Sequence, residues 1–132
     1  MELRDLAPTL LQLADVEAPK GMSASSLLPI LTGDADPSVH RQAVRSEYYH
    51  TLSPQGGFKG SYATMVRTRR FKLVVYHELD RGELLDLQQD PGEFENLWDD
   101  PTHCQIRFEL LKQMMDQLAH AINIGPEQVA AF

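Results

Sequence analysis

The side chains best suited to direct chemistry in this chain are four basic residues that lie close together, namely Arg67, Arg69, Arg70 and Lys72. Guanidinium groups match the geometry of sulfate and carboxylate groups, so a hairpin end carrying three arginines could hold an anionic substrate. The alternative is structural, because exposed hairpin ends are commonly basic and these groups could pair with carboxylates across a sheet. The candidate partners are Asp86, Asp90 and Glu93.

Metal-ligand candidates come from the acidic residues between positions 80 and 95. A hard cation needs several convergent oxygen ligands. This run lacks the regular spacing of a calcium loop, and strand alternation would send Glu83 and Asp86 to opposite faces of a sheet. The sequence at His77 begins like a zinc motif but lacks its second histidine. We therefore expect a solvated acidic turn and no metal site.

Four segments have the β-branched and aromatic content of strands, and they cover residues 42–49, 62–68, 71–78 and 82–87. Only Arg69 and Arg70 separate the second from the third, which leaves room for nothing but an antiparallel hairpin. Proline and glycine make residues 53–60 a loop. The four strands can form one sheet with a single buried face.

Helical patterns precede and follow these strands. Residues 5–14 predict a short helix with Asp5 as its capping residue, and residues 25–33 predict a serine-capped turn ended by Gly33. Asp100 and Pro101 begin a long helix whose apolar residues recur at helical spacing until Gly125 and Pro126. This apolar stripe needs a partner surface, and only the sheet is large enough. The predicted fold class is therefore α+β: about four antiparallel strands packed on a long C-terminal helix, preceded by two short N-terminal helices.

Composition limits the classes of partner. The chain has 132 residues, 42% of them hydrophobic, and 12 Lys and Arg against 19 Asp and Glu give a net charge of -7. Its length suits one compact unit with a real core. A negative balance argues against nucleic acid or an anionic membrane as partner. No apolar run approaches the ~18 residues of a membrane span, and no signal peptide is recognisable within the chain. The sequence therefore does not encode a cellular location.

The order of motifs carries a resemblance to a known family. A basic strand is followed by a strand beginning Gly82-Glu-Leu-Leu-Asp-Leu and by the acidic turn Asp90-Pro-Gly-Glu-Phe-Glu-Asn-Leu. This order resembles the C-terminal subdomain of sulfatases, in which an ELYDL-like strand and a DPxExxNL turn precede a last helix. Residues 5–14 and 21–33 are similar to the sulfatase segments DLxPTLLxLAG and GxSLLPLLxG, although Asp15 stands where the family usually has glycine.

The resemblance implies that the catalytic residues lie elsewhere. Sulfatases use a cysteine or serine in a CxPxR or SxPxR context, which is oxidised to formylglycine and works with a divalent cation. The only cysteine, Cys104, lies in Cys-Gln-Ile-Arg-Phe and lacks that proline and spacing. We expect it to be a buried or half-buried helix residue. No cofactor is therefore expected in this chain, whereas a parent protein is expected to use calcium and formylglycine.

The substrate-rim candidates come partly from the resemblance. The loop after the first strand can lean over the active-site cleft in sulfatases, which makes Tyr49, His50 and Lys59 candidates to contact a sugar, an aryl group or a sulfate. Arg67 and Arg69 complete the candidate set. The alternative for His50 is that it is a polar surface residue beside a strand end, without a role in substrate binding.

The interpretation that follows is a sulfatase C-terminal domain fragment, which supports a catalytic domain, helps to shape its substrate pocket and is not catalytic alone. Residues 1–33 are expected to belong to the edge of a missing catalytic domain, and residues 34–132 to form the C-terminal subdomain. The expected partner is that N-terminal catalytic domain, and an exposed interface could also support a homo-oligomer. Two alternatives stay open: a free-standing binding or dimerisation module, and a fragment of a related phosphonate monoester hydrolase.

Overall fold

The computed structural model describes residues 1–49 and 62–122, with side chains described up to residue 119, and it divides the chain into two units. One unit is Met1–Arg41 together with residues from Asp116 onward, and the other is Gln42–Met115. Among the described residues, no helix is both long and apolar enough to span a membrane.

The N-terminal segment contains both predicted short helices. A 3-10 helix, η1 (Leu3–Asp5), leads into α1 (Leu6–Leu13), and α2 (Leu28–Leu31) and a second 3-10 helix, η2 (Pro37–Val39), follow. Gly33 ends α2 with a φ of +84°, as the sequence predicted. Asp15 has a φ of 57° just after α1. This left-handed conformation favours glycine, and aspartate is one of the few other residues that tolerate it. Aspartate at position 15, where the sulfatase pattern usually has glycine, is therefore compatible with this conformation.

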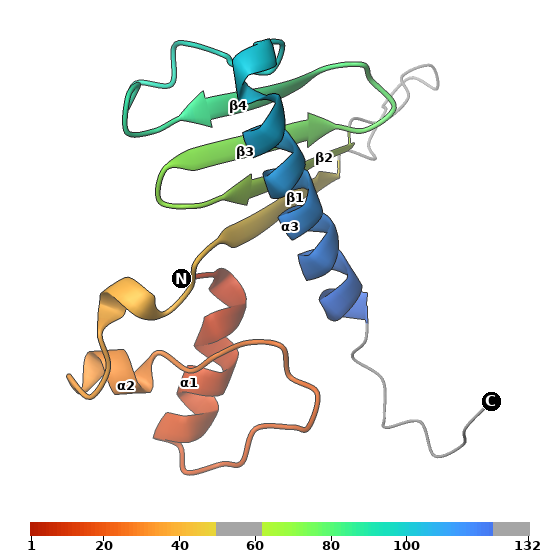
Figure 1. Cartoon of the computed structure of the whole chain (residues 1–132). Helices are drawn as coiled ribbons and strands as arrows, with labels where there is room; N and C mark the ends of the chain where they lie inside the picture. The colour runs from red at the N-terminus through yellow and green to blue at the C-terminus, as the bar shows by residue number, and fades with distance from the viewer. Residues whose placement is uncertain (50–61, 123–132) are drawn as a thin grey trace, which may run out of the picture. The chain divides into compact units, whose positions relative to one another are not determined.

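The second unit is built on one antiparallel sheet. Its strands are β1 (Val44–Tyr49), β2 (Tyr62–Arg67), β3 (Phe71–Tyr76) and β4 (Gly82–Asp86), and they lie in the order β1-β2-β3-β4 (Figure 1). Thr68 closes the predicted hairpin between β2 and β3, because its hydroxyl oxygen accepts a hydrogen bond from the Phe71 amide at 2.9 Å.

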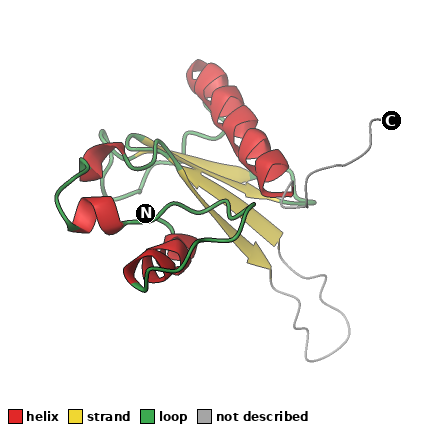
Figure 2. Cartoon of the chain, turned by 90° about the horizontal axis from the view of Figure 1, so that it is seen from below, coloured by secondary structure: helices red, strands yellow, loops and turns green. Residues whose placement is uncertain are grey.

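The core lies on one face of this sheet. Val66, Leu73 and Leu84 stand directly opposite one another on three neighbouring strands, and each is 0% exposed. The helix α3 (Cys104–Ile122) lies across one face of the sheet in both views (Figures 1 and 2) and contributes the buried Leu110 and Met114. The apolar stripe of the C-terminal helix predicted that this helix would cover the sheet.

The start of α3 is fixed by two local contacts. Asp100 accepts a hydrogen bond from the Thr102 amide at 2.8 Å, which caps a 3-10 turn, η3 (Pro101–His103), that continues into α3. Arg107 lies with its guanidinium 5.1 Å from the centre of the Trp98 ring, and that ring fills the space beside Gly82 in β4. The predicted α+β fold, with four antiparallel strands and a long C-terminal helix, is confirmed.

Candidate functional site

Tyr49, the first predicted rim residue, lies at the end of β1. Its hydroxyl donates a hydrogen bond to the Glu47 carboxylate at 2.9 Å, and its ring meets that of Tyr62 edge-on at 5.7 Å. The hydrogen bond to Glu47 raises the pKa of Tyr49, so the phenol stays neutral at physiological pH. Tyr49 is therefore suited to contact a ligand through its ring and unsuited to act as a base. His50 and Lys59, the other candidates from this loop, lie outside the described residues.

His77 lies just after the end of β3, beside Tyr62 of this tyrosine pair. Its amide donates to the Tyr62 carbonyl at 2.9 Å, and its Nε2 lies 2.8 Å from the hydroxyl of the buried Thr64. Because directly paired residues share a face of a sheet, Tyr49, Tyr62 and His77 lie on the same side at one end of the strands. We call these three residues the aromatic end. Sequence reasoning examined His77 only as an incomplete zinc motif and missed this grouping.

Arg67 and Arg69 lie at the opposite end of the sheet. Arg67 pairs with Val44, whereas Tyr49 pairs with Tyr62 five positions away along β2. At about 3.3 Å per residue the separation is roughly 17 Å, and an odd offset places the two side chains on opposite faces. Both side chains are exposed, and neither makes a hydrogen bond or ion pair with another described residue. The structure therefore separates the predicted rim residues into two groups.

The other two basic residues of the hairpin have structural partners. Arg70 donates from Nε and Nη2 to the Asp86 carboxylate at 3.0 and 2.8 Å, and Lys72 forms an ion pair with Glu93. The hydrogen bond from Arg70 is the main reason that the pKa of Asp86 is lowered. The structural alternative thus holds for Arg70 and Lys72, and only Arg67 and Arg69 remain candidates for an external anion.

Asp5 is the most highly connected carboxylate in the N-terminal unit, and the sequence prediction of its role was wrong. It makes no capping hydrogen bond to α1. Instead the fully buried side chain accepts hydrogen bonds from the Glu2 amide at 2.9 Å, the Ser25 amide at 3.2 Å and the guanidinium of Arg41, and it lies 3.2 Å from Nε2 of His40. Burial raises the pKa of Asp5, but the hydrogen bond from Arg41 and the others outweigh it and hold that pKa below its usual range.

These contacts make Asp5 a structural hub. It joins the start of α1 to two segments that lie 20 and 36 residues further along the chain. A neighbouring side chain continues the connection, since the hydroxyl of Thr9 accepts a hydrogen bond from the Leu27 amide at 2.8 Å. No simple spacing in the sequence signals such a hub, because its partners are distant along the chain.

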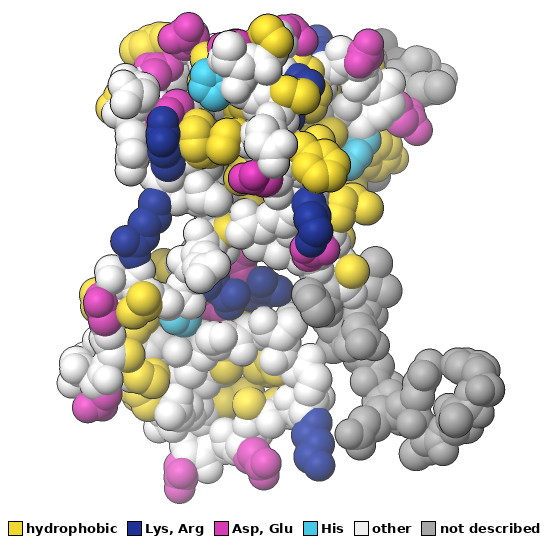
Figure 3. Space-filling model, in the orientation of Figure 1, with side chains coloured by type: hydrophobic (Ala, Val, Ile, Leu, Met, Phe, Trp, Pro, Cys, Tyr) yellow, Lys and Arg dark blue, Asp and Glu magenta, His cyan; other side chains and the backbone are white. Residues whose placement is uncertain are grey.

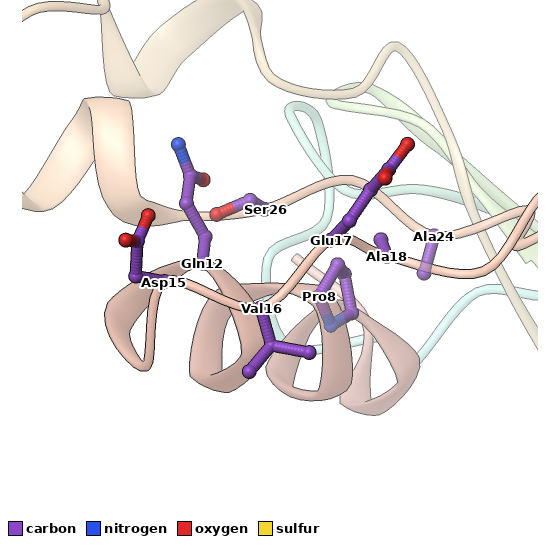
Figure 4. A pocket seen from close by; sticks show the side chains of 8 residues that line it. All are labelled: Pro8, Gln12, Asp15, Val16, Glu17, Ala18, Ala24 and Ser26. Atoms are coloured by element: carbon purple, nitrogen blue, oxygen red, sulfur yellow. The ribbon is translucent and has the colours of Figure 1, made fainter.

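A pocket of about 540 Å³ lies between α1 and two stretches that follow it, residues 15–18 and 24–26 (Figure 4). Pro8 and Gln12 line it from α1, and the remaining lining residues are Asp15, Val16, Glu17, Ala18, Ala24 and Ser26. Among the described lining residues, the charged groups are the carboxylates of Asp15 and Glu17. An anionic ester would be repelled there, so this pocket does not match the substrate class that the motifs suggest.

The described residues form no metal centre. They contain no group of three or more His, Cys, Asp or Glu side chains placed to hold a metal ion. Cys104 is exposed at the start of α3, so the expectation of a buried or half-buried thiol was wrong. The buried residues of this helix are Leu110 and Met114, which lie further along it.

The apolar stripe of α1 is exposed. Leu6, Leu10 and Leu13 are 45%, 64% and 59% exposed, whereas the residues that α1 buries are Pro8 and Thr9. Hydrophobic side chains are visible at the surface of this part of the chain in Figure 3. A regular stripe of leucines on a helix is unusual at a surface that faces only water. These leucines therefore form a surface that another protein segment could cover.

Comparison with known proteins agrees with these observations. A family model described as the C-terminal part of N-sulphoglucosamine sulphohydrolase matches residues 1–120. A Delta 4,5-hexuronate-2-O-sulfatase from Bacteroides thetaiotaomicron is 36% identical over 108 residues, which cover 80% of this chain and 21% of that protein. A solved structure of a 2-O GAG sulfatase has a TM-score of 0.76 and 32% identity, and the match covers 90% of this chain and 25% of that one.

A phosphonate monoester hydrolase from Silicibacter pomeroyi is also similar, with a TM-score of 0.67 and 30% identity over 96% of this chain and 26% of that one. The chain thus spans about a fifth to a quarter of the length of these relatives. The motif order, the fold and the family match agree with one another. This chain belongs to the family of sulfatase C-terminal domains typified by that of N-sulphoglucosamine sulphohydrolase.

Proposed function

We propose that this chain is the supporting lobe of a longer sulfatase, and that α1 packs its leucines against a catalytic α/β domain. The exposed stripe of Leu6, Leu10 and Leu13 carries this proposal. Covering three leucines would contribute several kcal/mol, at about 25 cal/mol for each Å² of apolar surface removed from water. The relatives are four to five times longer than the matched region, which leaves ample chain for such a partner.

The longer protein would hydrolyse sulfate esters. Its nucleophile, a formylglycine, and its divalent cation, calcium, would be held by the catalytic domain, since the described residues of this chain contain no group of metal-ligating side chains. Cys104 is exposed but stands outside the CxPxR context. The contribution of this chain would be to position the catalytic domain and to shape the pocket that admits the substrate.

The aromatic end is the part of the sheet that we propose for that pocket. Tyr49, Tyr62 and His77 offer rings and a hydrogen-bonding nitrogen to a sugar or aryl group, and β1 ends and β2 begins here, so His50 and Lys59 lie between them in the sequence. Arg67 and Arg69 would act at a separate place, as anchors for an anionic group further along a polymeric substrate.

The domain assignment follows from the same proposal. Residues 1–33 would complete the edge of the catalytic domain, and residues 34–132 would form the C-terminal subdomain. The hydrogen bond from the Ser25 amide to Asp5 holds the start of α1 to residue 25 within the first segment, and the contact with Arg41 joins that segment to the beginning of the second.

A second candidate reaction is hydrolysis of a phosphonate monoester, which the similarity to the Silicibacter pomeroyi enzyme favours. A sulfate and a phosphonate ester present similar anionic oxygens to arginine side chains. Assays with both esters distinguish the two reactions.

Coexpression tests the docking. The reading frame upstream of Met1 is expressed as one tagged polypeptide and this chain as another. We expect the two to purify together, and we expect Leu10→Glu to abolish copurification without unfolding this chain. If the wild-type pair does not associate, or if no catalytic segment is encoded nearby, the chain is a free-standing module and the proposal fails.

A further inference from the structure

Among the residues that the structure describes, the two edges of the sheet differ in how they are protected. At the β4 edge, the Leu97 amide donates to the Leu84 carbonyl at 2.8 Å. The Asn96 side chain accepts from the Leu84 amide at 3.0 Å and donates to the Gly82 carbonyl at 3.0 Å. Residues 96–97 therefore take the place of a further strand. β1 is the opposite edge strand and pairs, within the sheet, with β2 alone (Figure 1). An edge strand of six residues is a template for another strand.

The direction of the backbone groups of β1 follows from the hydrogen bonds of its neighbours. The His77 amide donates to the Tyr62 carbonyl, and the Thr68 amide donates to the Phe71 carbonyl, so the even-numbered residues of β2 bond to β3. The odd-numbered residues of β2 must then bond to β1. Their partners on β1 are Val44, Ser46 and Tyr48. Consequently, the backbone groups of Arg45, Glu47 and Tyr49 point away from β2, toward the outer edge.

This alternation limits how β1 could pair with a second copy of itself. In an antiparallel pair, outward-pointing residues must face outward-pointing residues. Three central registers satisfy this condition. One places Arg45 opposite Arg45 of the second copy, and another places Glu47 opposite Glu47 of the second copy. Both juxtapose like charges, which is destabilising.

Only the third register is complementary in charge. It puts Ser46 on the two-fold axis, with Arg45 opposite Glu47 of the second copy and Glu47 opposite Arg45 of the second copy. Within one chain, Nη1 of Arg45 already lies 2.7 Å from Oε1 of Glu47, so the two chains would form a ring of alternating charges. On the other face Val44 stands opposite Tyr48 of the second copy, and such β-branched and aromatic pairs are favourable.

We propose that two copies of this chain associate through β1, antiparallel about a two-fold axis at Ser46, and join their four-stranded sheets into one continuous sheet. Backbone hydrogen bonds supply most of the attraction, and the charges select the register because like charges directly opposite each other are destabilising. A contact this small forms a weak, reversible dimer. The inference is independent of the proposed function, since it depends on the edge of the sheet and not on α1.

Sedimentation velocity of the full chain over an about hundredfold range of concentration tests the association. We expect a monomer–dimer equilibrium. Glu47→Pro removes an outward-pointing amide and leaves the β1–β2 ladder intact, so it should abolish the dimer. Leu10→Glu should leave the dimer unchanged. A wild-type chain that stays monomeric throughout, or a dimer that survives Glu47→Pro and is lost with Leu10→Glu, would overturn the proposal. Circular dichroism confirms that each variant is folded.

Disulfide trapping tests the register. In a Cys104→Ser background, Ser46→Cys places the two introduced thiols in a non-hydrogen-bonded pair with Cα atoms about 4.5 Å apart, within the range of a disulfide. We expect rapid oxidation to a covalent dimer. Tyr48→Cys is the control, because its thiols lie on the same face but four positions out of register. Equal crosslinking at the two positions would contradict the axis at Ser46.

A charge exchange gives a third readout. Arg45→Glu alone and Glu47→Arg alone put like charges opposite each other and should weaken the dimer several-fold. The double variant restores opposite charges and should recover it. Failure of the double variant to recover, with both single variants folded, would contradict the register.

Discussion

Asp5 and Arg41 form a buried ion pair across 36 residues, with Nε of the arginine 3.1 Å from Oδ2 of the carboxylate. The Asp5 side chain is fully buried, and only 16% of the Arg41 side chain is exposed. Pairs of this kind are costly to break from one side, because the remaining charge stays buried without compensation. The N-terminal segment should therefore depend strongly on this contact.

Asp5→Asn should lower the free energy of unfolding by about 3 kcal/mol, because it removes one charge and leaves the Arg41 guanidinium uncompensated. Chemical denaturation followed by far-ultraviolet circular dichroism measures the change. Glu17→Gln, at an exposed carboxylate in the same unit, is the matched control and should change stability by less than about 0.5 kcal/mol. Equal effects for the two variants would show that the hub does not stabilise the fold.

Acid should weaken the wild-type chain through the same residue. The pKa of Asp5 is lower in the folded state than the value near 3.9 of an unfolded aspartate. Its stabilising contribution is therefore complete above the unfolded pKa and is lost as the pH falls from about 5 toward the folded pKa. Denaturation midpoints measured between pH 7 and acid should fall less steeply for Asp5→Asn than for wild type. Parallel curves would contradict this assignment.

Gly82→Ala should disturb the contact between β4 and Trp98. A methyl group at this position would lie 2.2 Å from the indole ring, which is too close for any side chain. Overpacking of this kind costs about 1–3 kcal/mol. Because the chain has one tryptophan, the displaced ring should also change the fluorescence spectrum. Gly33→Ala, where φ is +84° and no atom lies within 4 Å, should cost stability through strain and leave the fluorescence unchanged.

The leucines of α1 should contribute little to the stability of this chain alone. Leu10→Glu replaces a side chain that is 64% exposed and should change the free energy of unfolding by less than about 0.5 kcal/mol. Leu73→Ala, at a position that is 0% exposed, should cost about 2–5 kcal/mol. A large loss of stability with Leu10→Glu would mean that α1 packs within this chain and is not free to dock.

Arg67 and Arg69 should affect substrate binding and not folding. In the longer protein, replacing both with alanine should raise KM for a sulfated polysaccharide while leaving kcat and the melting temperature near wild type. Arg70→Ala should lower the melting temperature and leave KM near wild type, because the Arg70 guanidinium is hydrogen-bonded to Asp86. An unchanged KM for the double variant would assign these arginines to the solvated surface.

The strands and helices were predictable because their signals are local. Residues 62–68 and 71–78 alternate as strands, and two intervening residues allow only a hairpin. Asp100 and Pro101 mark a helix start through contacts that span two residues. The role of Asp5 could not be predicted in this way. An aspartate just before a leucine-rich helix predicts a cap for that helix. The actual partners of Asp5, Ser25 and Arg41, become its neighbours only when the chain folds.

The candidate rim residues stay a prediction, and their arrangement in space could not be read from the sequence. The family resemblance made Tyr49 a candidate and guanidinium chemistry made Arg67 one, but strand register puts them at opposite ends and on opposite faces of the sheet. The pairing of Tyr62 and His77 beside Tyr49 also depends on register, which no single segment encodes. The order of motifs predicted the family because it draws on residues along the whole chain. A site, in contrast, depends on which residues become neighbours in the folded structure.

The most direct test of the account is the rate of aryl sulfate hydrolysis, with calcium, by this chain alone and by the same chain joined to the reading frame upstream of Met1. We predict no turnover by the chain alone and turnover by the joined protein that disappears when the cysteine or serine of its CxPxR or SxPxR motif is replaced. Turnover by the isolated chain, abolished by Cys104→Ser, would contradict the claim that this domain supports a catalytic centre located elsewhere.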